Sequence, residues 1–142
     1  MAKGLYAARK LIKNRKKFRW AKKDLFRKRS GLWKKYDPLE GAPMARGLVL
    51  QKVVVGVKQP HSGLRKCVKV QILKNGKVVT VYCPGVNAIK IINEHDEVVI
   101  ERLHAPQRRA FGDMPGVKFR VIKVAGVCLK EILRGKKQKP TR

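Results

Sequence analysis

Acidic residues are the scarcest feature of this chain. Nine Asp and Glu stand against 36 Lys and Arg, a formal net charge of +27 over 142 residues, and no acid occurs between Glu40 and Glu94. Self-repulsion of this size destabilises a compact monomer, so we expect an anionic partner in the native state. Nucleic acid is the first candidate, because Lys and Arg displace the counterions condensed on phosphates.

Long hydrophobic runs are also missing. No stretch of about 20 apolar residues suggests a transmembrane helix, and no apolar segment follows the N-terminal charges as in a secretory signal. An anionic membrane surface is the rival partner. A helix lying on a membrane needs a wide apolar face, whereas the basic N-terminal segment has a thin one. We therefore expect no membrane partner.

Few residues are available for catalysis or metal binding. The three cysteines, Cys67, Cys83 and Cys128, form no C-x-x-C pair, and an odd number argues against a disulfide framework and fits a reduced, cytoplasmic setting. His61 and the other two histidines lack metal-ligand spacing. Neither a cofactor nor a metal is expected. A thiol hydrolase built on Cys67, a histidine and Asp96 or Asp113 finds no support in the spacing, so no enzyme is predicted.

Residues 1–46 are predicted to form a basic N-terminal extension and linker. Residues 1–35 hold fifteen Lys and Arg and a single acid, Asp24. Apolar residues at helical spacing predict a partly helical arm, marginal alone and ordered on its partner. Residues 36–46 contain Pro38, Gly41 and Pro43 and are predicted to be extended. The cations expected to bind RNA from this extension are Arg9, Lys10, Lys13, Arg15, Lys16, Lys17 and Arg19.

From Gly47 onward the apolar pattern has a period of two, which indicates strands. Asn75-Gly76 predicts a type I′ hairpin, and Pro115-Gly116 predicts a type II turn. Short strands without long intervening helices predict a mainly β fold, a five-stranded OB-like antiparallel barrel over residues 47–128, with a sandwich as the alternative. Residues 129–142 are predicted to form a short helix and a basic, disordered tail. The expected strands cover residues 47–57, 67–73, 78–83, 97–103 and 117–124.

The first of two unusual loops, KQPHSGLRK, covers residues 58–66 and joins the first two predicted strands. Pro60 fixes one backbone angle and stiffens the loop. The hydroxyl of Ser62 both donates and accepts hydrogen bonds, which suits a ribose 2′-OH in an RNA minor groove. The candidate RNA-binding residues here are Lys58, Pro60, His61, Ser62, Gly63, Arg65 and Lys66.

The second loop, FGDMPGVKFR, covers residues 111–120. Asp113 is its one acid, amid several cations. We expect this carboxylate to accept hydrogen bonds from the backbone N–H groups of its own turn, because a bare carboxylate facing phosphate would be repelled. The candidate residues of this loop are Gly112, Asp113, Pro115, Gly116 and Lys118.

These motifs, with EHDEV between them, resemble the universal small-subunit ribosomal protein family numbered twelve in bacteria and twenty-three in archaea and eukaryotes. GLYAARKL, DPLEGAPMARGLVL and GKKQKP resemble its archaeal branch. His61 and Gly63 stand where the family has Asn and Ala, and Lys118 replaces its usual Arg, so the chain resembles a divergent member.

The resemblance implies an OB-type barrel at the decoding centre and an extension threaded into the ribosomal RNA of the small subunit. It implies no enzymatic activity. The partners that it implies are ribosomal RNA and neighbouring ribosomal proteins, with transfer RNA, messenger RNA and elongation factors as transient partners. In the family the first loop reaches the A site, and the second lies beside it and helps to set decoding accuracy.

Two binding modules outside the ribosome are alternatives. A free-standing OB-fold protein for RNA or single-stranded DNA would display aromatic side chains on its strands, whereas most of the nine aromatic residues here precede Gly47. A chromatin-type DNA packer would use the basic arm but would have no use for the two Pro-containing loops.

Overall fold

The computed structural model describes residues 3–104, 110 and 112–140. The chain divides into two compact units, Met1–Gly41 and Ala42–Arg142. The first unit contains three helices, α1 (Ala7–Ala21), α2 (Lys23–Arg29) and α3 (Leu32–Tyr36). Lys22 has an extended conformation and separates α1 from α2. No residue of α1 or α2 is buried, as expected for helices covered with like charge.

The junction of α1 and α2 is held by an aromatic contact. Trp20 and Phe26 meet edge to face with ring centroids 6.2 Å apart, and the guanidinium of Arg29 lies 5.1 Å from the centre of the Trp20 ring. Both contacts are favourable because the positive ring edge, or a cation, meets the negative face of a ring. The helical arm predicted from the spacing of apolar residues is therefore present, but it is interrupted at Lys22, which the spacing did not predict.

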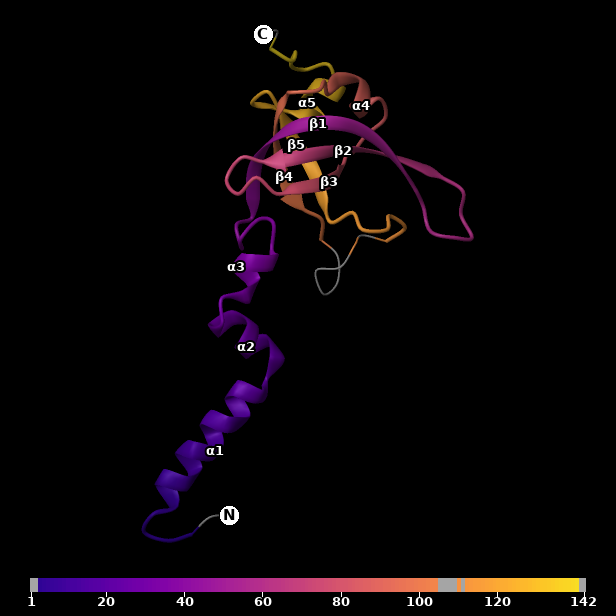
Figure 1. Ribbon diagram of the computed structural model, residues 1–142. Helices are drawn as coiled ribbons and strands as arrows, with labels where there is room; N and C mark the ends of the chain where they lie inside the picture. Colours follow the sequence, from indigo (N-terminus) through magenta and orange to yellow (C-terminus); the bar gives the residue numbers. More distant parts are fainter. Residues whose placement is uncertain (1–2, 105–109, 111, 141–142) are drawn as a thin grey trace. The chain divides into compact units, whose positions relative to one another are not determined.

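The second unit is mainly β, as predicted (Figure 1). Two short helices, α4 (Ala88–Ile91) and α5 (Leu129–Leu133), accompany its strands, and α5 is the short helix predicted at the start of residues 129–142. The strands are β1 (Met44–Gly56), β2 (Leu64–Ile72), β3 (Val78–Tyr82), β4 (Glu97–Arg102), β5 (Phe119–Val124) and β6 (Val127–Cys128).

The strands form one sheet in the order β3-β2-β1-β4-β5-β6, and an additional pairing between β3 and β5 joins β1 to β5 in a ring. The pairing that closes the ring is parallel, with Val81 opposite Phe119 and Tyr82 opposite Arg120. The ring of five strands agrees with the predicted five-stranded sheet, and the structure adds a short sixth strand and one parallel pairing that the sequence did not predict. Alternating apolar residues show that a segment is a strand, but they do not show its partner.

Two local predictions are wrong. Strand β1 begins at Met44, inside the predicted linker, because Met44 and Ala45 pair with Glu101 and Ile100 of β4. The hairpin between β2 and β3 has a five-residue loop, residues 73–77, instead of a two-residue type I′ turn. Only Gly76 of the Asn75-Gly76 pair takes a positive φ, 67°. In the second loop Gly116 has φ 74°, as a type II turn requires.

The core lies inside the ring and consists mainly of β-branched side chains. Val49, Val70, Val98 and Val121 are at most 1% exposed, and their alternation with exposed neighbours follows the pleat of the strands. Gly47 of β1 leaves no room for a side chain against β2. A Cβ atom there would lie 2.7 Å from the carbonyl oxygen of Gln71 and closer still to Cγ1 of Val70.

Residues 135–140 are held by hydrogen bonds, contrary to the prediction of a disordered tail over 135–142, and residues 141 and 142 lie outside the described residues. Gly135 takes φ 73° after α5, and the N–H of Lys136 donates to the carbonyl of Glu131. The ammonium of Lys139 donates to the carbonyl oxygen of Ile91 (3.1 Å) and to the carboxylate of Asp96. The ion pair between Lys139 and Asp96 holds this segment against the sheet, and the composition of the segment did not predict that contact.

Candidate nucleic-acid interface

The first loop is carried by a two-stranded ribbon. Strands β1 and β2 pair from Gln51 opposite Lys69 to Gly56 opposite Leu64, and this hairpin projects beyond the ring (Figure 1). Beyond the last strand pair, the N–H of Val57 donates to the carbonyl of Gly63 at 3.0 Å. The N–H of His61 donates to the carbonyl of Lys58 at 3.1 Å, which closes the turn.

Every residue of the first loop, 58–66, is exposed, including the side chains of Pro60, His61 and Ser62. Its last three residues belong to β2. The Gln59–Pro60 peptide bond is cis. A ribbon that ends in an exposed polar tip between cations places hydrogen-bonding groups where another macromolecule can reach them.

The second loop is anchored beneath the ribbon. Met114 (3% exposed) and Val117 (1% exposed) pack in a buried cluster with Cys67 of β2 and Leu103. Between the two buried side chains, Pro115 and Gly116 form the exposed turn. Burial of two apolar residues on either side of the turn fixes its position relative to β2.

Asp113 joins the two loops. Its backbone carbonyl accepts the N–H of Lys58 at 3.0 Å. Its carboxylate oxygen Oδ2 accepts Nε and Nη2 of Arg65 at 3.1 and 2.7 Å. The hydrogen bond from Arg65 holds the pKa of the Asp113 carboxyl below its usual value, and the same bond raises the pKa of Arg65. Arg65 is thus the main partner of this carboxylate, and a backbone N–H of the kind that the sequence suggested, that of Asp113 itself, contributes less.

The structure brings together three of the predicted site residues, Lys58, Arg65 and Asp113, by direct bonds. Gly112, Pro115, Gly116 and Lys118 are exposed around them. The backbone carbonyl of Lys118 accepts the N–H of Leu103 at 2.8 Å, which ties the end of the second loop to the end of β4. The neighbouring residues 105–109 and 111 lie outside the described residues. The seven predicted cations between Arg9 and Arg19 all lie on α1, in the first unit.

Most acids of the second unit are neutralised within the chain. Four of the six acidic residues after Glu40 form ion pairs. The pairs are Arg46–Glu97, Arg65–Asp113, Arg120–Glu101 and Lys139–Asp96. Few carboxylates therefore remain to compete for the surface cations, which favours an external polyanion.

The described part of the chain contains neither a membrane-spanning helix nor a cluster of metal ligands. Its helices include none long and apolar enough to cross a membrane. Among residues 3–104, 110 and 112–140, no three His, Cys, Asp or Glu side chains gather in a group that could hold a metal ion.

Fold and charge together define a small, strongly basic, mainly β protein with a helical extension. The family model of Ribosomal protein S12/S23 matches residues 32–142, and the chain belongs to this family. It is a ribosomal protein of the small subunit, with a structural and non-enzymatic role in translation. Family membership implies ribosomal RNA and other ribosomal proteins as partners and the ribosome as location. Helices α1 and α2 precede the matched residues.

Proposed function

We propose that this protein supports accurate decoding at the A site of the small subunit in the cytoplasm, where its two joined loops face the messenger and transfer RNA. The observation that carries the proposal is the double link at Asp113, which binds Lys58 through its backbone and Arg65 through its carboxylate. Burial of Met114 and Val117 also fixes the second loop, so the two loops are held rigidly together. Transfer RNA, messenger RNA and elongation factors are its transient partners.

Accuracy needs a site that binds correct minor-groove geometry better than a mismatch. A loop that is already fixed loses little conformational entropy on binding. The fixed positions of its hydrogen-bond donors therefore distinguish the correct minor-groove geometry from a mismatch. Ser62 supplies the RNA-facing hydroxyl, and Lys58 and Lys66 hold the tip to phosphates. His61 and Gly63 flank Ser62 in the sequence, and Pro60 restricts the backbone conformation of the loop.

The ring of strands supports an OB-type barrel. Its neighbours run β1-β2-β3-β5-β4 and back to β1, which is the connectivity of a five-stranded Greek-key barrel of the OB kind. The S12/S23 match favours such a barrel within the ribosome over a free-standing binder.

The helical extension anchors the protein to ribosomal RNA through α1. If about ten Lys and Arg contact phosphates, log K for binding to a duplex fragment falls with log salt at a slope of roughly −9. A slope near zero for the full chain would exclude electrostatic anchoring.

The decoding role is tested by Ser62→Ala in assembled ribosomes. We expect a changed miscoding frequency with normal incorporation of the protein into the small subunit. Ser30→Ala is the matched control, because Ser30 is also exposed but its hydroxyl donates to the carbonyl of Phe26 in the first unit. If Ser62→Ala and Ser30→Ala ribosomes make errors at the same rate as the wild type, the assigned role is wrong.

A further inference from the structure

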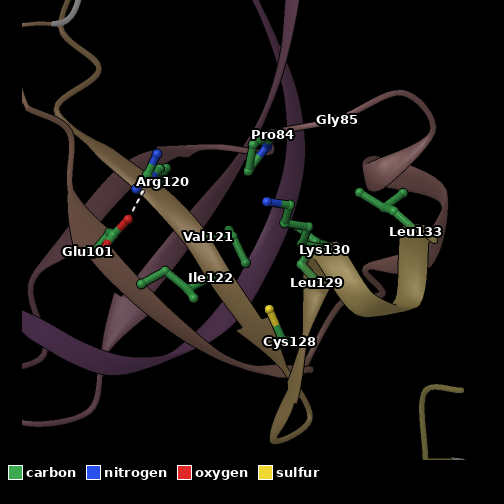
Figure 2. A pocket seen from close by; sticks show the side chains of 10 residues that line it. All are labelled: Pro84, Gly85, Glu101, Arg120, Val121, Ile122, Cys128, Leu129, Lys130 and Leu133. Carbon is green, nitrogen blue, oxygen red and sulfur yellow. Dashed lines mark hydrogen bonds and ion pairs between the residues drawn. The ribbon is translucent and has the colours of Figure 1, made fainter. Parts of the chain in front are cut away.

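A groove lies on the second unit, between the turn after β3, strands β4 to β6 and α5 (Figure 2), and apart from Arg120 its lining residues lie outside the two loops. Its volume is about 380 Å³, within the range of small-ligand sites. The lining residues are Pro84, Gly85, Glu101, Arg120, Val121, Ile122, Cys128, Leu129, Lys130 and Leu133.

The floor and one wall of the groove are apolar. Ile122 follows the buried Val121 on β5 and is itself partly exposed, so it faces outward. Leu133 of α5 lies against Gly85, where a Cβ atom would come within 2.6 Å of Cδ1 of Leu133. The backbone of the turn at Pro84 therefore approaches α5 closely, and the groove has an apolar wall that a flat group can rest on.

The charged groups of the groove favour an anion. Its one acid, Glu101, is 17% exposed at the side chain and is ion-paired with Arg120. Lys130 is exposed and forms no ion pair with the acids of the described chain. Two cations against one paired acid leave a net positive charge beside the apolar floor.

We propose that this groove binds one unstacked nucleotide of the ribosomal RNA, with its base against the apolar lining and its phosphate at Lys130. The proposal rests on the proposed RNA-binding function and adds a site outside the decoding loops. A base with an attached phosphate matches a groove whose lining is mainly apolar and carries an exposed cation. An apolar side chain of a neighbouring protein would fill the floor but leave Lys130 without an anion.

The first experiment titrates the full chain with uridine and adenosine 5′-monophosphates and follows backbone amides by NMR. We expect shifts concentrated at Ile122, Lys130 and Leu133, with weaker effects from nucleosides and from inorganic phosphate. Lys130→Ala should weaken nucleotide binding roughly tenfold, the effect of losing one charge-assisted hydrogen bond. The matched control is Lys123→Ala, an exposed cation that follows Ile122 on β5 and does not line the groove. Equal losses in both variants would overturn the proposal.

The second experiment uses small subunits assembled with the full chain and with ribosomal RNA carrying 4-thiouridine. Photo-crosslinking to peptides containing residues 120–133 supports the nucleotide. A crosslink of the groove to another ribosomal protein, made with a photoreactive group at Ile122, overturns it. Equal rates of reaction of Cys128 with a thiol reagent in the free chain and in the subunit also overturn the proposal.

These outcomes separate the groove from the proposed function. If the protein binds ribosomal RNA and enters subunits while the groove stays empty, only the groove proposal fails. If the full chain shows no salt-dependent binding to ribosomal RNA, the RNA-binding function fails as well.

Discussion

The ammonium group of Lys139 lies between the carboxylate of Asp96 and the carbonyl oxygen of Ile91. The two ion-paired side chains are 19% and 10% exposed. The same carboxylate accepts the N–H of Asn93 at 2.7 Å. A residue close to the C-terminus thus holds the corner between α4 and β4.

Replacing Lys139 with Met should destabilise the protein. The substitution keeps much of the length of the side chain but leaves Asp96 largely buried without its cation, which costs about 3 kcal/mol in the free energy of unfolding. Urea denaturation measures the change. Lys137→Met removes an exposed cation two residues away and should have a small effect. Equal stability of the two variants would show that the contact contributes nothing.

The link between the loops should depend on pH. Because Arg65 holds the pKa of Asp113 below its usual value of about 3.9, the stabilisation is complete above that value. It is lost as the pH falls through the lowered pKa in the folded protein. An NMR titration of the Asp113 carboxyl carbon measures this pKa. Arg65→Gln should move it up toward the usual value, whereas Lys66→Gln should move it less; equal effects would contradict the pairing.

The three cysteines should differ in reactivity. Cys67 and Cys83 are at most 2% exposed. Burial raises the pKa of Cys67 and, with help from Cys67, raises that of Cys83 to about 12. Since the thiolate is the reactive form, a thiol reagent at pH 8 should modify Cys128 first and the other two only after unfolding. Fast modification of all three in the native protein would contradict their burial.

Gly47→Ala should destabilise the sheet. The added methyl group meets the Gln71 carbonyl and the Val70 side chain, and overpacking of this kind costs about 1–3 kcal/mol. Thermal unfolding measures the loss. Gly56→Ala on the same strand meets no atom within 4 Å and serves as the control. A similar melting temperature for both variants would mean that β1 shifts without cost.

Local sequence patterns predicted the strands and α5 well. The alternation around Val68, Val70 and Ile72 identifies one face of β2, and Asn75-Gly76 marks the reversal that follows. The turn type was wrong because the strands stop pairing before the Asn-Gly pair, and the loop between them is longer than two residues.

Contacts between distant parts of the chain could not be predicted in the same way. Arg65 and Asp113 are 48 residues apart, and Asp96 and Lys139 are 43 apart. Each ion pair depends on how distant segments of the chain pack together, and a local pattern contains no information on that. The sequence indicated Asp113 as an unusual acid, but it did not reveal its partner.

Leu50 interrupts the register of β1 with β2 between Val49 and Gln51. Beyond this bulge six residues of β1, Gln51–Gly56, continue toward the first loop, a length of about 20 Å at 3.3 Å per residue. Over that length, a change of about 5° in the direction of the ribbon would move its tip by about 1.7 Å. A displacement of that size would break a hydrogen bond, so the bonds of Asp113 with Lys58 and Arg65 fix the position of the first loop.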